Sequence, residues 1–269
     1  HAYVRRQRQM CIRDSGDGAG ILTQIPYNFF DDEIAKTGHE KRDETLGIGM
    51  MFLPRNDYAA LEKCRTIIES ELLDHGYYIY GWRQVPINNS VIGEKANSTR
   101  PEIEQVMFVN NIERDKDFDF AKELYLVRRR LEKRIAKQQI NGFYVCSLSF
   151  ESIIYKGLFL AEQLSIFYTD LANEEFISSF AVFHQRYSTN TFPSWGLAQP
   201  FRLLAHNGEI NTISGNTNWM RNHQTRITTE IFGDDSEQVK PIIEKNVSDS
   251  SALDAAFELY VRAGRSVPV

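Results

Sequence analysis

The sequence predicts a mixed fold, α/β or α+β, and three observations indicate it. The chain has 269 residues with 42% hydrophobic and 12% aromatic content, enough for a sizeable core. Short apolar runs of strand length alternate along it with two longer segments of helical period. No internal repeat, low-complexity tract or obvious linker interrupts this alternation, so neither an all-α nor an all-β chain is expected.

The first half of the chain supplies most of the predicted strands. Gly18 to Ile25 is glycine-rich and then apolar, which is typical of a turn leading into a strand, and Thr45 to Pro54 is a second buried strand. Asp57 to Asp74 is a predicted helix, with Asn56 or Asp57 as its cap and His75-Gly76 at its end. Its apolar positions recur near the helical period: Leu61, Ile67, Ile68, Leu72 and Leu73. Strands are expected next at Tyr77 to Val85 and Gln105 to Asn110.

The second half opens with a long predicted helix, Phe118 to Gln138. Its apolar side consists of Leu124, Val127, Leu131 and Ile135. The basic side chains of Arg128 to Arg130, with Lys133 and Arg134, are interpreted as a solvated face. Strands are expected at Phe143 to Phe150 and Ile177 to Tyr187, on either side of a short helix near Glu162 to Tyr168.

Charge and cysteine content exclude several classes of function. The net charge of -5 gives no basic face for nucleic acid or an anionic membrane. No apolar run approaches the roughly 18 to 20 residues that span a bilayer, and the N-terminus has no apolar signal core. Cys11, Cys64 and Cys146 are far apart, which argues against a zinc or iron-sulfur site in this chain. We therefore expect a cytoplasmic protein without a metal site.

The last third of the chain carries side chains that suit free glutamine. Glutamine requires a planar two-donor partner for its carboxylate, an anion for its ammonium, and donors where an oxyanion forms on its amide. Arg186, after an apolar strand, can supply the first, and Asp249 the second. Asn207 and the backbone N-H of Gly208 can supply the third, because glycine permits a close approach of the main chain.

Each of these features alone has a more ordinary interpretation. An arginine after a strand is usually a surface ion pair, and an Asn-Gly dipeptide is usually a hairpin turn. Ser248-Asp249-Ser250 would cap a helix running from Ala252 to Arg262. His184 and His206 would be packing or hydrogen-bonding residues, since no third ligand is spaced to join them at a metal. Only the joint pattern favours a glutamine site.

That joint pattern resembles the type II glutamine amidotransferase domain at the N-terminus of glutamate synthase large subunits. The strings that carry the resemblance run from residue 16 to the end of the chain. They are residues 16–22, 155–157, 184–195, 197–202 and 204–212, then Gly215-Asn216, residues 218–221, 248–250 and 252–254. The two long strings at 184–195 and 204–212 favour glutamate synthase over other type II amidotransferases, which share mainly the H-x-R and H-N-G cores.

The resemblance implies a fold and a set of roles. The fold would be α+β, the N-terminal-nucleophile hydrolase four-layer αββα sandwich with two antiparallel sheets, incomplete at both ends. Arg186 would hold the glutamine carboxylate, Asp249 its ammonium, and Asn207 with Gly208 the oxyanion, while Thr189 would line the pocket. An N-terminal cysteine thiol would attack the side-chain amide, with its own α-amino group as the base, to give ammonia and then glutamate.

The start of the chain departs from that family pattern. Residues 1–15 are polar and basic, resemble translated adapter sequence, and are interpreted as a non-native segment before a partial domain at 16–269. Cys11 is followed by Ile12-Arg13 and lies five residues before Gly16, which leaves no room for the strand and helix expected after the nucleophile. The nucleophilic cysteine is therefore expected to be absent, and the chain as written to bind glutamine weakly at best and not to hydrolyse it.

The resemblance also implies partners that lie outside this chain. A complete glutamate synthase would pass ammonia to 2-oxoglutarate in a downstream synthase domain that uses FMN and an iron-sulfur cluster. Electrons would come from NADPH, NADH or ferredoxin, in some cases through a small electron-donating subunit. None of these groups is expected within the 269 residues.

Two other interpretations remain open at this point. Residues 16–20 imitate a glycine-rich phosphate loop, with Glu40 about twenty residues further on, but a nucleotide site needs a strand before the loop and a helix after it. The second alternative is a non-catalytic module, a pseudo-amidotransferase that binds glutamine or a partner chain. It requires the unusual N-terminus to be genuine.

Overall fold

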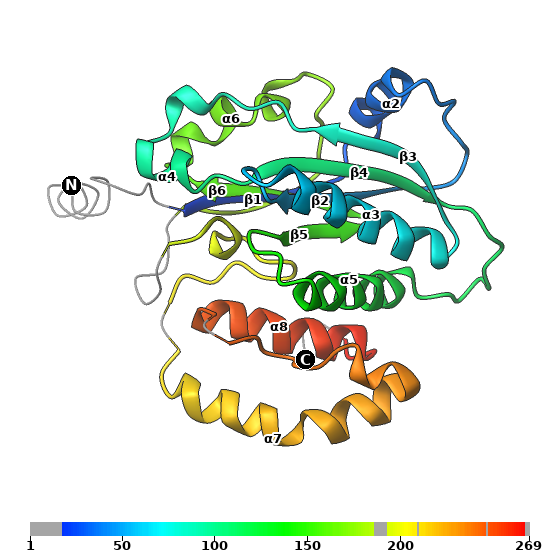
Figure 1. Ribbon diagram of the computed structural model, residues 1–269, viewed down its shortest axis with the longest axis vertical. Helices are drawn as coiled ribbons and strands as arrows, with labels where there is room; N and C mark the ends of the chain where they lie inside the picture. The colour runs from blue at the N-terminus through cyan, green and yellow to red at the C-terminus, as the bar shows by residue number, and fades with distance from the viewer. Residues whose placement is uncertain (1–17, 186–192, 209, 246, 267–269) are drawn as a thin grey trace, which may run out of the picture.

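The structure, a computed structural model, describes residues 18–185, 193–208, 210–245 and 247–266 (Figure 1). The strands are β1 (Gly18–Gln24), β2 (Leu46–Leu53), β3 (Tyr77–Gln84), β4 (Glu102–Asn110), β5 (Tyr144–Ser149), β6 (Ser152–Leu158) and β7 (Ala181–His184). The helices are α2 (Tyr27–Lys36), α3 (Tyr58–Asp74), α4 (Glu94–Ser98), α5 (Phe120–Lys137), α6 (Leu164–Phe167), α7 (Ile213–Phe232) and α8 (Asp249–Arg262).

The strands form two antiparallel sheets. One has three strands in the order β6-β1-β7, and the other has four in the order β3-β4-β2-β5. An apolar core between the sheets includes Tyr155 of β6 and Phe52 of β2. The α+β class with two antiparallel sheets is therefore confirmed, whereas the complete four-layer sandwich stays a prediction.

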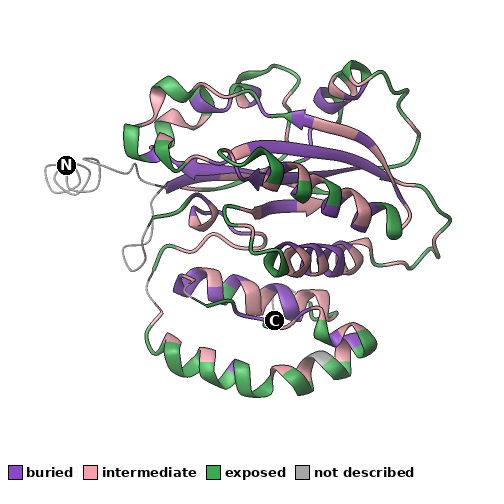
Figure 2. Ribbon diagram, viewed as in Figure 1, coloured by how far each residue is buried: buried purple, intermediate pink, exposed green. Residues whose placement is uncertain are grey.

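The helices add two further layers on the outer side of the four-stranded sheet. A second core joins that sheet to α3 and α5 through residues such as Ile68 and Val127. A third core joins the opposite side of α5 to α7, α8 and the segment between them, through residues such as Tyr125 and Leu259. Figure 1 shows α8 and α7 lying beyond α5, and Figure 2 shows that α7 exposes much of its surface while the central strands are largely buried.

Most elements of the first 150 residues occur where the sequence predicts them, within a few residues. The expected cap of α3 is confirmed, because Asp57 Oδ1 accepts a hydrogen bond from the Ala60 backbone N-H at 2.9 Å. The sequence did not predict α2, α4, β6 or α7.

The strand predicted at Ile177 to Tyr187 is shorter, because β7 begins at Ala181. In the residues before β7, hydrogen bonds that involve side chains take the place of backbone pairing with β1. Gln24 N donates to Ser178 Oγ, and Gln24 Oε1 accepts from Ser179 N, both at 3.0 Å.

The predicted solvated face of α5 is wrong at two of its five basic residues. Arg128 and Arg129 are 4% and 7% exposed, because α8 and the segment before it cover that side of the helix. Their guanidinium groups pair with Glu132 of the same helix, and Arg128 also pairs with Glu258 of α8. Buried charges of this kind need partners, and the basic run is neutralised rather than hydrated.

The phosphate-loop interpretation of residues 16–20 is not supported by the fold. Gly18 already belongs to β1, and the next helix, α2, begins only at Tyr27. Gly20 has a packing role instead, since a Cβ there would lie 2.5 Å from Lys156 Cβ and 2.7 Å from the Gln199 carbonyl oxygen. The glycine therefore permits β1 to lie against its neighbour strand and the Gln199 segment.

Candidate functional site

The candidate site centres on an irregular segment, residues 199–208 and 210, between the three-stranded sheet and the start of α8. Gln199 is 4% exposed, and its side-chain amide pairs with one backbone unit of this segment. Its Nε2 donates to the His206 carbonyl at 2.9 Å, and its Oε1 accepts from the His206 N-H at 2.7 Å. This two-point pairing resembles a rung of a sheet and fixes the residue directly before Asn207.

The N-terminus of α8 holds the other side of the segment. Ser248 caps the helix through a hydrogen bond from Ser251 N at 3.1 Å. Asp249, at 9% exposure, accepts from Ile210 N at 2.8 Å through Oδ2 and from Ser250 N at 2.6 Å through Oδ1. The Ser250 hydroxyl lies 2.9 Å from His206 Nδ1.

These contacts confirm the ordinary interpretation of residues 248–250 as a helix start, and the functional one stays a prediction. The residues begin a helix, as the capping pattern predicts. The same turn also contacts the Asn-Gly segment, so Asp249 lies near Asn207 in the fold although 42 positions separate them in the chain. A carboxylate has about four acceptor positions. Asp249 Oδ1 accepts from the Ser250 N-H and hydroxyl, and Oδ2 accepts from Ile210 N, which leaves one position on Oδ2 for an ammonium donor.

Two histidines meet beside this turn. His184 ends β7, where its Cα lies opposite Gly20 of β1. Burial lowers the pKa of His184, and the nearby His206 lowers it further, although a hydrogen bond with the His206 backbone acts in the opposite direction. His184 is therefore biased toward its neutral form, consistent with a packing and hydrogen-bonding role.

Asn207 and Gly208 are exposed, and no strand follows β7 in the described part of the chain, so this dipeptide does not join two strands and the hairpin interpretation is wrong. Within the part of the chain that the structure describes, the Asn207 side-chain amide has no hydrogen-bond partner. A Cβ at Gly208 would lie 3.0 Å from His206 Nε2, so a larger residue would displace that ring. The Asn207 side-chain amide and the Gly208 backbone N-H lie on a segment that is anchored at both ends. Both groups can donate hydrogen bonds to a developing oxyanion.

Two of the predicted site residues, Arg186 and Thr189, lie outside the described residues, as does Cys11. The other two cysteines are buried free thiols, on opposite faces of the four-stranded sheet. Burial raises the pKa of Cys64 to about 11 and that of Cys146 to about 12, so neither is an activated nucleophile.

The sequence missed Gln199, Ser250 and Asp254 as parts of this site. All three are buried polar residues. The signal available was their position inside or next to the strings that carry the family resemblance, but a string does not say which residue contacts which backbone group.

A groove of about 860 Å³ lies next to the segment, over the outer face of the three-stranded sheet. Its lining includes Leu22, Val182, Pro200, Leu203 and Leu204, and does not include Asn207, Gly208 or Asp249. Among the described residues, no three His, Cys, Asp or Glu side chains gather as metal ligands. No helix in the described ranges has the length and apolar character needed to cross a membrane.

Comparison with known proteins identifies the family of the chain. The chain matches the family of class-II glutamine amidotransferases over residues 5–269. It is 57% identical over 255 residues to the glutamate synthase [NADPH] large chain of Azospirillum brasilense, an alignment covering 95% of this chain and 17% of that protein. It is 44% identical over 255 residues to the chloroplastic ferredoxin-dependent glutamate synthase of Spinacia oleracea, covering 94% of this chain and 16% of that protein. The chain thus spans only a small part of the length of these relatives.

Proposed function

The chain belongs to the class-II glutamine amidotransferases, and from this premise we propose that it is the glutamine-hydrolysing part of a glutamate synthase large chain. The observation that carries the proposal is the anchoring of His206 and Ile210, on either side of Asn207 and Gly208 in the chain, against the first turn of α8. It brings donors suited to an oxyanion and a carboxylate suited to an ammonium into one small region.

Each polar group of glutamine has a proposed partner. Asp249 binds the ammonium, and Arg186 binds the carboxylate as a two-donor fork. Asn207 and the Gly208 N-H receive the side-chain carbonyl oxygen, and Thr189 lines the pocket. The buried setting of Asp249 supports its role, because a desolvated carboxylate binds a cation more strongly than an exposed one.

The proposed chemistry is nucleophilic acyl transfer. A cysteine thiol at the N-terminus of the mature domain, deprotonated by its own α-amino group, attacks the amide carbon of glutamine. The carbonyl oxygen gains negative charge at the Asn207 and Gly208 donors, and the C-N bond then breaks. The α-ammonium returns the proton to the leaving nitrogen, which departs as ammonia. Water cleaves the thioester, releasing glutamate and restoring the thiol.

The proposed domain is the segment 16–269, with residues 1–15 as a non-native addition. In the parent protein, ammonia would pass to a downstream synthase domain that forms glutamate from 2-oxoglutarate, in the cytoplasm. The names of the relatives support either NADPH or ferredoxin as the electron source.

The described residues offer no set of ligands for the iron-sulfur cluster proposed for the parent. Cys64 and Cys146 are single buried thiols in separate cores, and the described part of the chain holds no cluster of three metal-ligating side chains. We propose that the parent holds its FMN and its iron-sulfur cluster outside this chain.

Calorimetric titration with glutamine, and with glutamate and asparagine as controls, tests the binding proposal. Glutamine should bind most tightly, and Asp249→Asn should weaken its binding by about tenfold or more, because the ammonium loses a charged partner. Lys41→Ala, on a surface far from α8 in the chain, should have no effect. Equal binding of glutamine and asparagine would contradict the proposal.

Hydrolysis is tested separately, by ammonia release and by labelling with the glutamine analogue 6-diazo-5-oxo-L-norleucine, followed by mass spectrometry. We expect no labelled cysteine and no ammonia from the chain as written. Labelling of Cys11, together with activity lost in Cys11→Ala, would overturn the proposed absence of the nucleophile. Glutamine binding without hydrolysis, in a chain confirmed at genomic level to begin with residues 1–15, would instead favour the non-catalytic module.

A further inference from the structure

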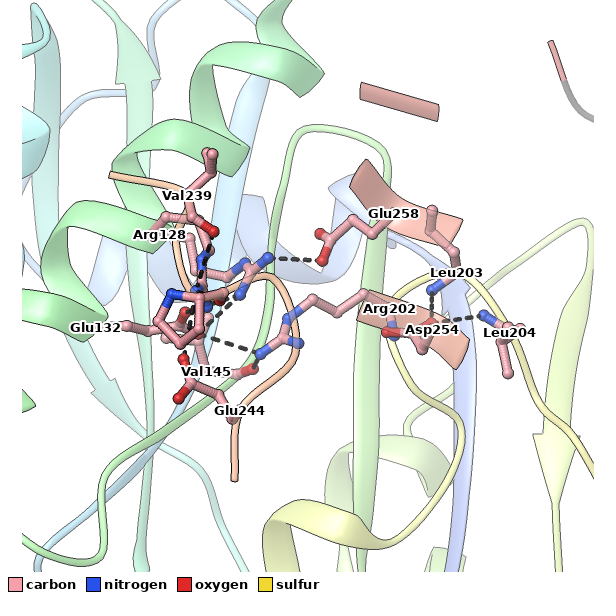
Figure 3. A network of polar contacts seen from close by, with 12 residues as sticks. Arg128, Glu132, Val145, Arg202, Leu203, Leu204, Val239, Glu244, Asp254 and Glu258 are labelled. Atoms are coloured by element: carbon pink, nitrogen blue, oxygen red, sulfur yellow. Dashed lines mark hydrogen bonds and ion pairs between the residues drawn. The ribbon is translucent and has the colours of Figure 1, made fainter. Parts of the chain in front are cut away.

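Asp254, in the second turn of α8, is buried at 2% exposure and receives backbone N-H groups from the site segment. Leu203 N and Leu204 N donate to its Oδ1 at 3.0 and 3.2 Å, and Arg202 N donates to its Oδ2 at 3.4 Å. Successive N-H groups that converge on one anion form a concave cradle whose shape depends on that anion. Figure 3 shows the Asp254 carboxylate between α8 and this loop.

Helix α8 therefore contacts the segment at both ends. Asp254 holds the N-terminal part at residues 202–204, and Asp249 holds Ile210. The two carboxylates are five residues apart, about 7.5 Å along the helix axis. Asn207 and Gly208 lie between these two anchors in the chain. The spacing of the two carboxylates along the helix therefore helps to set the position of the backbone that carries the oxyanion donors.

The Arg202 side chain ties the Asp254 anchor to the layers beneath it. Its guanidinium donates to the Val145 carbonyl of β5 at 2.7 Å and to Glu132 of α5 at 3.3 Å. Glu132 also accepts from Arg128, which in turn donates to Glu258 of α8 at 2.6 Å (Figure 3). The segment is thus connected through charged, buried groups to β5, α5 and α8, and not to α8 alone.

We propose that Asp254 is a positioning residue of the glutamine site: by holding the backbone of residues 202–204, it sets where Asn207 and the Gly208 N-H lie relative to the substrate amide. The proposal rests on the proposed function for its substrate. It does not require Asp254 to touch glutamine. Without the carboxylate, three partly buried N-H groups lose their acceptor, and the segment keeps Gln199, Ser250, Asp249 and the Arg202 side chain as anchors.

Asp254→Asn tests the proposal with little change in shape. The asparagine oxygen can still accept from Leu203 and Leu204, but its NH₂ group faces the Arg202 N-H, which needs an acceptor. The matched control is Glu258→Gln, one turn further along α8. Glu258 is buried in the same network through Arg128, yet makes no hydrogen bond to residues 202–204.

Amide hydrogen exchange is the first readout. After correction for global stability from urea unfolding, Asp254→Asn should speed exchange in peptides covering residues 202–208 by about tenfold or more, as expected for loss of a charge-assisted hydrogen bond. Glu258→Gln should stay within about twofold of the parent chain there. Equal acceleration in both variants, or none in Asp254→Asn, would overturn the proposal. If Asp254→Asn does not fold, Asp254→Ser, with a small hydroxyl acceptor, must give the same contrast.

Glutamine affinity is the second readout and separates this proposal from the proposed function. We expect Asp254→Asn to weaken glutamine binding by about fivefold or more and Glu258→Gln to leave it within about twofold. Faster exchange with unchanged affinity would overturn the positioning role. No binding by the unaltered chain would overturn the proposed function and the positioning role together, whereas the exchange contrast would still establish the anchor as a property of the fold.

Discussion

Two networks of buried charged side chains lie on opposite sides of the four-stranded sheet, and they differ in what they hold. In the core between the sheets, Arg83 of β3 donates two hydrogen bonds to Asp170, at 2.6 and 2.7 Å. Gln105 of β4 and Tyr155 of β6 complete the set, and Glu33 of α2 accepts from Arg83 Nε. Every member lies on a strand, a helix or the short 3-10 turn Thr169–Ala172.

The network beyond α5 contains the same kinds of charged groups, but it also includes a residue that lies outside the helices and strands. Arg128 and Glu132 lie on α5, and Glu258 and Asp254 lie on α8. Arg202, by contrast, lies on the irregular segment, and Asp254 accepts from the backbone of that segment rather than from a side chain. The first network joins regular elements to one another, whereas the second joins regular elements to the segment that carries the candidate site.

This difference predicts that the two networks have separate roles in the stability of the fold and in the position of the site. Loss of the inter-sheet network should lower the stability of the whole fold. Loss of the outer network should also move Asn207 and Gly208. The following variants test that separation, in order of the effect expected on the free energy of unfolding.

Asp170→Ala should have the largest effect. It leaves the Arg83 guanidinium at 8% exposure with Glu33 as its remaining carboxylate partner, and breaking a buried pair in this way costs about 3 to 5 kcal/mol. Urea unfolding measures the loss. Lys41→Ala, which removes an exposed pair with Asp31, should cost less than about 1 kcal/mol.

The comparison predicts more than a loss of stability for Asp170→Ala. Once global unfolding is accounted for, exchange at residues 202–208 should match that of the parent chain. A selective acceleration there would show that the inter-sheet network also positions the site, and would break the proposed separation.

Glu132→Gln tests the outer network through pH. Burial raises the pKa of the Glu132 carboxyl, but Arg128, Arg129 and Arg202 outweigh burial and hold that pKa at about 2, below its ordinary value of 4.5. The folded state therefore favours the charged form, and its stabilisation is present above pH ~4.5 and lost as pH falls toward 2, a change of about 3 kcal/mol. The stability gap between the parent and Glu132→Gln should shrink over that range in urea titrations.

Asp254 in the same network should show the opposite trend. Burial, and then Glu258, raise the pKa of Asp254 above its ordinary value of 3.8. The folded state favours its protonated form, so the parent should lose stability relative to Asp254→Asn as pH rises from ~3.8 through the higher folded pKa. The difference in stability between parent and variant should therefore change in opposite directions with pH for Glu132→Gln and Asp254→Asn. A change in the same direction for both would show that the two carboxylates do not titrate as the geometry implies.

Gly20→Ala extends the comparison to a backbone contact. The added Cβ would lie 2.5 Å from Lys156 Cβ and 2.7 Å from the Gln199 carbonyl, so the strand or the segment must shift, at about 1 to 3 kcal/mol. Gly215→Ala in α7 is the matched control: its Cβ meets nothing within 4 Å, and a helical alanine should stabilise by roughly 0.5 to 1 kcal/mol. Because Gln199 holds His206, Gly20→Ala should also weaken glutamine binding. Unchanged binding would mean that the segment is fixed from α8 alone.

The sequence predicted which apolar residues are buried better than it predicted which charged residues are buried. The apolar period of α3 and α5 follows directly from which positions face a sheet, so Ile68 and Val127 could be assigned to the core. The burial of Arg128 depends on α8, which arrives more than 100 residues later in the chain, and a local charge pattern holds no information about it. The missed strand β6 has the same cause, since its Lys156 is 0% exposed only because the segment from Gly196 onward covers it.

The candidate site was predictable in composition but not in geometry. Joint residue types and family resemblance singled out Asn207, Gly208 and Asp249, and the fold brings these three into one region. The anchors Gln199 and Asp254 were not predicted, because their contacts are with backbone groups, which leave no mark on the sequence of the residues that donate or accept. The roles of all five residues, these three together with Arg186 and Thr189, stay predictions.

Ser248→Ala should have the smallest effect on stability and the sharpest contrast in function. Ser248 caps α8 through Ser251 N, and Asp57 caps α3 through Ala60 N, so replacing either by alanine should cost about 1 kcal/mol. Urea unfolding should therefore not distinguish the two variants. Only the α8 cap lies next to Asp249 and Ser250, so Ser248→Ala alone should loosen Ile210 and His206, which exchange and glutamine titration would detect. Equal glutamine affinity in both variants would mean that the first turn of α8 is held by its packing and not by its cap. Helix α8 would then position the site segment from Asp254 and not from its first turn.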